Sequence, residues 1–400
     1  MTLVTYQPLR RKLACSVLII LVFLLGRKIP LPYLQDLSIN NPLLTLSSMM
    51  TGGNLTRLSL FSLGLSPWMY AKLLLRLLSL GQEQDNWLLK QDSYSKGLSL
   101  IFSLLQAYFL VSSLVNQASL VFDGLAWLTV FLLTTGSFVL LWLTEVNSRY
   151  GIGQASLIIL VGMLSGQLQT LGDLSLPSGM SGIIVLVWLM LAIYLGVSLE
   201  KTTYPLAVKR LAISHPQFQD YSLPLGVNLG RSMAVLYAHS FLLLGQYALD
   251  FGAARFPRLL NWLWWKEAVS LDYPLGISFY AILVVILTLV FAFLNFDSLS
   301  FVCNLQKSGD YLLYQNPGRA SLAYVNHVLK RISLFTGLLL SLLVSLPWWL
   351  ALYEPSFFPL AGLTSQALAI TGMIRSIQEE VKTICLPLAY GPIFQEKTEG

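Results

Sequence analysis

The sequence predicts an all-α polytopic membrane protein, and its composition and apolar runs lead to this fold class. Apolar residues make up 55% of the 400 residues and charged residues only 11%, against about 25% charged residues in soluble proteins. So few charges cannot cover a water-facing surface, which excludes a soluble enzyme, a disordered scaffold and a fibrous protein. Ten mostly apolar runs suit helices that cross about 30 Å of hydrocarbon. They lie at 13–27, 62–80, 97–116, 126–144, 154–171, 182–200, 232–251, 274–294, 333–352 and 362–386.

The first apolar run follows a basic stretch, Arg10–Lys12, and this order is also found at the start of a secretory signal. The run is followed by Gly26–Pro30, which offers no small-residue cleavage site, and by further apolar runs. We therefore expect an uncleaved first spanning helix and not a cleaved signal.

The distribution of Lys and Arg predicts how the chain is oriented. With a cytoplasmic N-terminus, about sixteen Lys and Arg fall on the inner side and about six on the outer side, as the positive-inside rule requires. The protein is therefore expected to be a multi-pass plasma membrane protein with both termini in the cytoplasm. The two longest hydrophilic connections, 201–231 and 295–332, fall on the inner side, and water-facing loops of this length commonly carry function.

One segment between the first two spans does not fit the pattern. Leu43–Met50 is only eight residues long and cannot cross a membrane, and Gly52 and Gly53 follow it closely. The segment can form a short helix that enters a cavity and hinges on the two glycines, whose backbone angles are unrestricted. A surface loop explains the same residues equally well, so both interpretations remain open at this point.

The ten spans divide into two sets of five, with 1–181 as the N-terminal half and 182–400 as the C-terminal half. Two related halves with an odd number of spans insert in opposite directions and are related by a pseudo-two-fold axis in the membrane plane. The sequence has no internal similarity strong enough to prove this, and the symmetry is an architectural hypothesis.

Ionisable side chains inside a span are costly and are candidates for function. Lys72 and Arg76 lie in the second span, and Arg375, Glu379 and Glu380 lie in the last. Arg76 and the residues 379–382 are near the cytoplasmic ends, where we expect them to snorkel to the interface. Lys72 lies deeper and predicts a neighbouring wet cavity.

Enzymatic, metal and nucleic-acid functions have no support in the sequence. Cys15, Cys303 and Cys385 are too far apart for a disulfide framework or a metal site. No motif of a serine hydrolase, zinc protease or P-loop ATPase is present, so we expect neither an enzyme nor a cofactor. The net charge of +6 is modest and scattered, which argues against nucleic-acid binding. Energy for transport must then come from a gradient or from a partner.

Five stretches, in order and nearly over the whole chain, resemble the SecY family of protein-conducting channels. Residues Gly52–Trp68 (GGNLTRLSLFSLGLSPW) are similar to the family signature GGALSRFSIFALGIMPY, and Trp142–Gln154 resembles WLGEQITERGIGNG. The other similarities are Ile29–Pro32 to IPxPG, Leu223–Asn228 to LPLKVN, and Asn304–Gly309 with Asn316–Gly318 and Val328–Arg331 to NLKKxGG…RPG…VLxRLT.

The resemblance implies ten spans in two halves around an hourglass pore, which opens sideways between the second and seventh spans. Residues 43–53 would then be a plug that seals the outer funnel, with Leu43, Leu44, Leu46, Met49, Met50, Gly52 and Gly53 as its candidate residues. The pore ring would consist of Met69, Leu73, Ile159, Met163, Leu236 and Leu368. An apolar constriction of this kind excludes ions by dewetting and can yield around many cargo sequences. Taken singly, an apolar residue in a helical bundle is more often core packing.

The same resemblance implies partners for the cytoplasmic loops. They would bind a motor ATPase of the SecA type, and the residues expected to dock it are Lys209, Arg210, Lys307, Asn316, Lys330 and Arg331. Topology determination by positive charge is the other explanation of these basic residues. Further expected partners are small SecE-like or accessory subunits, the unfolded secretory polypeptide and membrane lipid.

The chain departs from the usual SecY pattern at several positions. Asn316 replaces an arginine, Arg375 replaces an acidic residue, Lys72 replaces a small polar residue, and 81–96 has fewer basic residues than usual. With the compact length, these departures resemble the accessory branch of the family in Gram-positive bacteria, which exports serine-rich repeat glycoprotein adhesins. The alternatives are a general SecY channel and, from another class, a secondary solute transporter with inverted repeats and broken helices.

Overall fold

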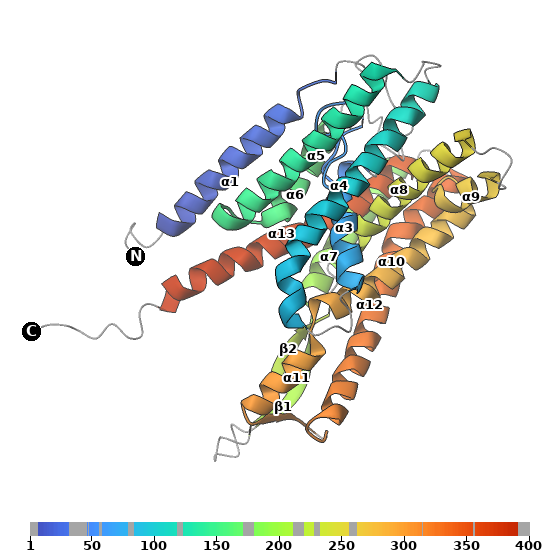
Figure 1. Ribbon diagram of the computed structural model, residues 1–400. Helices are drawn as coiled ribbons and strands as arrows, with labels where there is room; N and C mark the ends of the chain where they lie inside the picture. The colour runs from blue at the N-terminus through green and yellow to red at the C-terminus, as the bar shows by residue number, and fades with distance from the viewer. Residues whose placement is uncertain are drawn as a thin grey trace, which may run out of the picture.

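Ten long helices form the bundle and coincide in position with the ten predicted spans (Figure 1). The computed structural model describes residues 7–31, 46, 48–55, 58–78, 84–117, 123–170, 180–210, 220–227, 233–255, 262–313, 315–354 and 357–390. The long helices are α1 (Gln7–Gly26), α3 (Ser66–Leu78), α4 (Gln84–Gln117), α5 (Gly124–Tyr150), α6 (Gln154–Thr170), α7 (Met180–Lys201), α8 (Met233–Arg255), α10 (Pro274–Asn295), α12 (Arg319–Tyr353) and α13 (Phe358–Tyr390).

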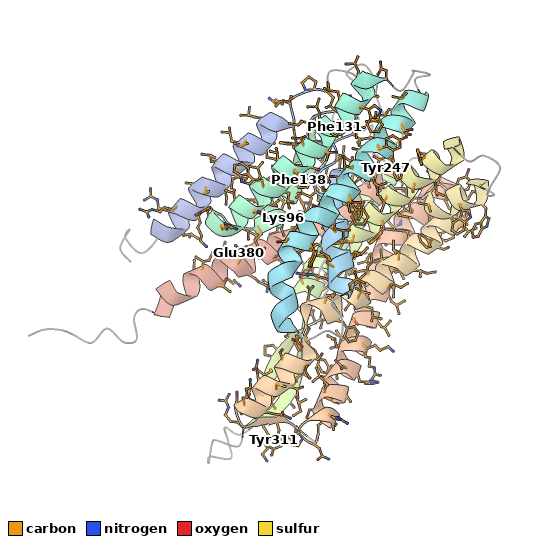
Figure 2. The ribbon with its side chains drawn as sticks, in the orientation of Figure 1. Lys96, Phe131, Phe138, Tyr247, Tyr311 and Glu380 are labelled. Atoms are coloured by element: carbon orange, nitrogen blue, oxygen red, sulfur yellow. The ribbon has the colours of Figure 1, made fainter. Side chains whose placement is uncertain are left out.

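Many of the helices present apolar side chains outward, as expected where lipid is the solvent. Phe131 on α5 is 61% exposed, while Tyr247 on α8 is buried; both are labelled in Figure 2. Five helical segments of the described chain are each long and apolar enough to cross a membrane. These segments are Ser93–Val115, Gly124–Tyr150, Gly182–Lys201, Pro274–Lys307 and Arg319–Tyr353. The chain is therefore a membrane protein.

The boundaries of several helices differ from the apolar runs that predicted them, and α4, α12 and α3 illustrate the causes. Helix α4 begins at Gln84 and α12 at Arg319, well before the runs at 97 and 333, because both helices continue into polar sequence. Helix α3 begins only at Ser66, since the preceding residues form turns and Gly64 adopts a positive φ of 61°. Pro67, at the first helical turn, has no backbone N–H to lose there and favours a start at this point.

The two long hydrophilic connections fold together and are not simple loops. Strand β1 (Thr203–Arg210) pairs antiparallel with β2 (Asp220–Gly226) and with β3 (Asp310–Leu312), in the order β2-β1-β3. Leu206, Val208 and Leu225 pack against Val302 of α11 (Ser298–Lys307) and Val325 of α12. We call β1–β3, α11 and residues 319–328 of α12 the sheet lobe; it projects from one end of the bundle (Figure 1).

One large apolar core joins the two halves of the sequence. It includes Phe23 of α1, Met69 of α3, Leu236 of α8, Val284 of α10 and Val344 of α12. Helices α3 and α4 contact α8, and α6 contacts α13, so segments from 1–181 and 182–400 pack directly against each other. The short helix α9 (Trp262–Val269), which was not predicted, packs on α8 and α10. The boundary between the halves at residue 181 stays a prediction.

Candidate functional site

A large cavity enters the bundle from the end that carries the sheet lobe. It has a volume of about 680 Å³ and reaches from Lys201, Thr203 and Gly226 down to Met69 and Ile159. Helices α3, α6, α8, α10 and α13 contribute to its wall. We call this cavity the funnel.

Charged side chains of both signs line the funnel, and they determine its character. The carboxylate Oε1 of Glu379 lies 3.2 Å from Nε of Arg375, one helical turn away on α13. Glu380 accepts a hydrogen bond of 3.0 Å from the backbone N–H of Gly153, which ties α13 to the start of α6. Arg76 lines the same wall. The prediction that Arg76 and residues 379–382 snorkel to the membrane interface is therefore wrong for Arg76, Glu379 and Glu380, because these side chains face a cavity inside the bundle.

Lys72 lies at the inner part of the funnel, as expected for a lysine at that depth. Its Nζ is 4.5 Å from the centroid of the Trp68 ring, a cation–π contact that stabilises a partly buried ammonium. Both residues also line a second cavity of about 410 Å³ between α3, α4, α5 and α6.

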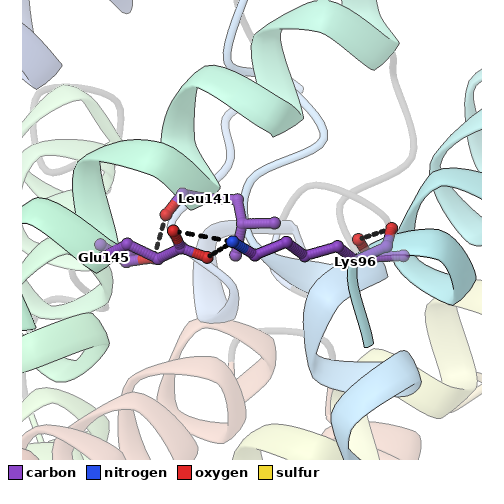
Figure 3. A network of polar contacts seen from close by, with 5 residues as sticks. Lys96, Leu141 and Glu145 are labelled. Atoms are coloured by element: carbon purple, nitrogen blue, oxygen red, sulfur yellow. Dashed lines mark hydrogen bonds and ion pairs between the residues drawn. The ribbon is translucent and has the colours of Figure 1, made fainter. Parts of the chain in front are cut away.

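The second cavity is framed by an ion pair between α4 and α5. Nζ of Lys96 lies 2.8 Å from Oε1 of Glu145, and the two side chains point toward one another across the gap in front of Leu141 (Figure 3). The pair is solvent-exposed, so its contribution to stability is small, about 0–1 kcal/mol.

The floor of the funnel is apolar. The six predicted ring residues come from four helices, α3, α6, α8 and α13, and every one of them is buried in the same apolar core. They are Met69, Leu73, Ile159, Met163, Leu236 and Leu368, with exposed fractions between 0% and 4%. Met69 and Ile159 form part of the funnel wall, so the core begins where the funnel ends. Their role as a pore ring stays a prediction.

On the far side of this floor lie the residues predicted to form a plug. Leu46 and residues 48–50 are helical, Met49 and Met50 are buried, and Gly52 adopts a positive φ of 79°. A positive φ favours glycine at this position. Leu43 and Leu44, also predicted to belong to the plug, lie outside the described residues.

The segment packs against glycines of α6 at very short range. A Cβ built on Gly162 would come within 2.5 Å of the Cα of Gly52, and one built on Gly166 within 3.0 Å of Cγ of Met49. Two backbone hydrogen bonds fix the end of the segment: the N–H of Gly53 donates to the carbonyl of Ser48, and the N–H of Leu65 donates to the carbonyl of Thr51. At Gly162 the neighbouring atoms are backbone, so only a residue without a Cβ allows this fit, whereas the contact at Gly166 is with the flexible side chain of Met49.

Three helices show the same order of features along their length. On α6, Gln154 lines the funnel, Ile159 lies at its floor and Gly162 and Gly166 contact the plug segment, over about 18 Å at 1.5 Å per residue. On α13, Arg375 lines the funnel, Leu368 lies in the buried core and Gly362 contacts Leu46.

On α3 the sequence of features is again the same. Arg76 and Lys72 line the funnel and Met69 is at its floor. Leu65, the residue directly before α3, donates a backbone hydrogen bond to Thr51 of the plug segment. The molecule therefore has a funnel lined by charged side chains, an apolar floor and a covering segment in line.

Arg27, which follows α1 directly, has a role that the sequence pattern did not indicate. Its Nη1 donates to the carbonyl of Gly162 at 2.7 Å and to Oγ of Ser165, and its Nη2 donates to the carbonyl of Gly53 at 3.4 Å. The only signal in the sequence was its place among the few cations on the predicted outer side.

The residues predicted to dock a motor gather on the sheet lobe and the neighbouring part of α12. Lys307 ends α11, Asn316 lies before α12, and both are exposed, as are Lys330 and Arg331 on α12. Lys209 and Arg210 lie at the end of β1 and are half-buried. The structure brings these six residues to one end of the molecule and leaves their docking role a prediction.

Arg210 has a structural role within the sheet lobe. Its Nε lies 3.3 Å from Oδ1 of the buried Asp310, its guanidinium covers the Tyr221 ring at 4.6 Å, and Tyr221 donates a 2.7 Å hydrogen bond to Asp310. A hydrogen bond with Tyr221, followed by the charge of Asp310, raises the pKa of Arg210. Partial burial and the bond to Asp310 raise the pKa of Tyr221.

A buried amide fixes the turn between α5 and α6, which forms part of the funnel wall. Asn147 accepts a 2.9 Å hydrogen bond from Ser16 of α1 and donates to the carbonyls of Ile152 at 2.9 Å and Gln154 at 2.8 Å. The N–H of Ile152 donates back to Ser16 at 2.8 Å. The turn is thereby tied to α1.

Comparison with known proteins identifies the family. A model of the SecY family matches residues 59–377, most of the chain. The chain belongs to the SecY family. Similar relatives are named "Accessory Sec system protein translocase subunit SecY2". The one from Streptococcus agalactiae is 28% identical over 97% of this chain and 96% of its own length. The one from Leuconostoc gelidum is 25% identical over 96% of this chain and 97% of its own length. The predicted likeness to the accessory branch of Gram-positive bacteria is confirmed.

Solved structures share the fold. One described as "The structure of a protein conducting channel" has a TM-score of 0.70 and 15% identity, and covers 97% of this chain and 95% of its own. Another, "Sec61 in the Canine ribosome-channel complex from the endoplasmic reticulum", has a TM-score of 0.62 and 17% identity with the same coverage. The predicted fold class, a polytopic helical membrane protein of the SecY type, is confirmed. The sheet lobe is an addition that the all-α prediction lacked.

Proposed function

We propose that this chain is the channel subunit of an accessory Sec translocase and conducts unfolded secretory polypeptides across the plasma membrane. The observation that carries the proposal is the order of funnel, apolar floor and plug segment along α3, α6 and α13. An apolar constriction holds back ions by dewetting and has no fixed partner chemistry, so it can accommodate many passing side chains. The names of the SecY2 relatives support the assignment to the accessory branch.

In this proposal the plug segment seals the resting channel. A solved structure that shares the fold, with a TM-score of 0.70 and 16% identity, is described with the words that its plug domain "stablizes the closed state of the translocation channel and maintains a membrane seal". The buried Met49 and Met50 and the close packing of Gly52 on α6 are what a seal at this place needs.

In this proposal a partner supplies the driving force, since the sequence has no P-loop motif with which to use ATP. A SecA-type motor would bind the sheet lobe and the neighbouring part of α12, where Lys209 and Lys307 of the lobe and Lys330 and Arg331 of α12 provide positive charge. The motor side would then be the cytoplasm, with both termini on that side, as the positive-inside rule predicts. Small SecE-like or accessory subunits would complete the assembly, and serine-rich repeat glycoproteins would be its cargo.

Reconstitution into liposomes tests the function directly. With its cognate motor and ATP, the protein should transport an unfolded secretory polypeptide into the lumen, where it becomes protected from added protease. Uptake of a small solute driven by an ion gradient alone, without motor-dependent protection of a polypeptide, would refute the channel and favour a secondary transporter.

Deletion of residues 43–53 tests the plug. The variant should fold and transport polypeptide but conduct ions at rest in a planar bilayer, because the cover of the apolar floor is gone. A resting conductance equal to that of the unmodified protein would show that this segment is not the seal.

A further inference from the structure

Arg27 is a cation held inside the bundle at the point where three segments meet. It leaves α1 at the end, its Nη1 binds the Gly162 carbonyl and Ser165 hydroxyl of α6, and its Nη2 reaches Gly53 of the plug segment. The ring of Phe23 lies 5.6 Å from its Cζ and covers one face of the guanidinium. A half-buried charge satisfied in this way is costly to move, because each hydrogen bond that it gives up leaves part of the charge without compensation.

The backbone that carries Arg27 is itself fixed in place. Phe61 packs directly on Gly26, where a Cβ would come within 2.1 Å of its ring, and it stacks on Phe23 with 6.0 Å between ring centroids. The backbone of Ile29 accepts a hydrogen bond from Leu60, and Leu31 donates one to Leu58. The guanidinium therefore projects from a rigid support and does not follow the plug segment if that segment moves.

The contacts of Arg27 on α6 coincide with the seat of the plug. Gly162, whose carbonyl accepts from Arg27, is also the residue that packs against the Cα of Gly52. Ser165 lies in the next turn, beside Gly166 and its contact with Met49. One planar guanidinium thus joins the seat on α6 to the residue that ends the plug segment.

We propose that Arg27 is a positioning residue that latches the plug onto α6 in the closed channel. The inference rests on the proposed function, since it gives a residue of the seal a defined task. The two terminal nitrogens of the guanidinium have different partners: Nη1 donates to α6 and Nη2 donates to the carbonyl of Gly53. When cargo displaces the plug, the 3.4 Å bond to Gly53 breaks first, and the bonds to Gly162 and Ser165 keep the charge satisfied.

The geometry also predicts how lysine would behave at this position. Lysine keeps the charge, but its ammonium is a single point and cannot span α6 and Gly53 in the way a planar fork does. R27K should therefore give an intermediate phenotype and R27Q a full one. Lys28, the exposed neighbour of Arg27, provides a matched control in K28Q.

The test combines resting conductance with a direct measure of plug position, in purified protein in bilayers. We expect R27Q to raise the resting ion conductance about tenfold, R27K less, and K28Q not at all. In a background with Cys15, Cys303 and Cys385 replaced by serine, M49C with G166C should form a disulfide, since a Cβ at Gly166 lies 3.0 Å from Cγ of Met49. R27Q should lower the yield of this disulfide at least threefold.

Each outcome decides the proposal. Unchanged conductance and unchanged disulfide yield in R27Q would overturn it, as would equal effects of R27Q and K28Q. If R27Q does not fold, S165A, which removes one α6 acceptor, is measured in the same assays, and wild-type values in S165A together with R27K would overturn the latch. Failure of the proposed function is seen separately, as absence of motor-dependent polypeptide transport by the unmodified protein, and R27Q would still lower the disulfide yield.

Discussion

Substitution of Gly162 by alanine is the sharpest test of how the plug segment is seated. The new Cβ would lie 2.5 Å from the Cα, 2.8 Å from the carbonyl oxygen and 3.1 Å from the carbonyl carbon of Gly52. All three are backbone atoms, so no side chain can rotate away and either α6 or the plug segment must move. Because α6 packs against α1, α5 and α13, we expect the plug segment to move.

The size of the effect follows from the clash. Overpacking of a close contact costs about 1–3 kcal/mol. The helix propensity gained by alanine, about 0.5–1 kcal/mol, stabilises α6 whether the plug is seated or not and cancels from the comparison. A shift of 1–3 kcal/mol changes the equilibrium between seated and released plug about 5- to 150-fold. G162A should therefore raise resting ion conductance in a planar bilayer by one to two orders of magnitude.

Two other glycines serve as graded controls for the same substitution. At Gly166 the new Cβ would meet Met49 at Cγ and Sδ, atoms of a flexible side chain, so G166A should have a smaller effect. At Gly97 of α4 it meets nothing within 4 Å, and G97A should leave the conductance unchanged. Equal conductance in G162A, G166A and G97A would refute the seat on α6.

Two further predictions concern other parts of the molecule. N147A should lower the free energy of unfolding by about 2–4 kcal/mol, because the buried Ser16 hydroxyl and Ile152 carbonyl and the part-buried Gln154 carbonyl lose their hydrogen-bonding partner. K96A should change it by less than about 1 kcal/mol. Thermal unfolding in detergent compares the two variants, and similar losses in both would contradict the reasoning. K307E with K330E should weaken binding of a SecA-type motor about tenfold without unfolding the sheet lobe, whereas R210E would also break the contact with Asp310 and is a poor test. A co-sedimentation assay measures the binding, and K382E, which changes an exposed charge on α13, is the control. Equal binding in all variants would place the docking surface elsewhere.

The sequence predicted the features that depend on local composition. A helix that crosses lipid must be apolar over most of its length, so each of the ten spans is visible in the sequence by itself. The polar ends of α4 and α12 were missed for the same reason, since hydropathy marks the apolar part of a helix and not its end. Leu43–Met50 stood out in the sequence because it is too short to span, but composition left a surface loop equally open, and only the resemblance implied a plug. The glycines were read as hinges, and their close packing on α6 was not predicted.

The sequence did not predict features that depend on contacts between distant residues. Leu206 and Val208 alternate with the smaller or polar residues Pro205, Ala207 and Lys209, which is at most a weak form of the pattern of a strand with one buried face. Alternation over so few residues is weak evidence, and the partner strand β3 lies about 100 residues further along the chain, where Arg210 pairs with Asp310. The contacts of Arg27 were likewise not predictable, because two of its acceptors are the backbone carbonyls of Gly53 and Gly162, which every residue type carries.

The placement of ring and seat on α6 has a mechanical consequence. Ile159, Gly162, Met163 and Gly166 follow the spacing i, i+3, i+4 and i+7, which puts them on one face of the helix. Gly52 packs on Gly162 and also on the backbone of Ile159, where a Cβ built on Gly52 would lie 3.3 Å from its Cα. Any shift of α6 that withdraws Ile159 from the floor of the funnel also moves the surface on which Gly52 rests. In the proposed channel we therefore expect widening of the floor and release of the plug to be one movement, on which a cargo chain that enters the funnel would act.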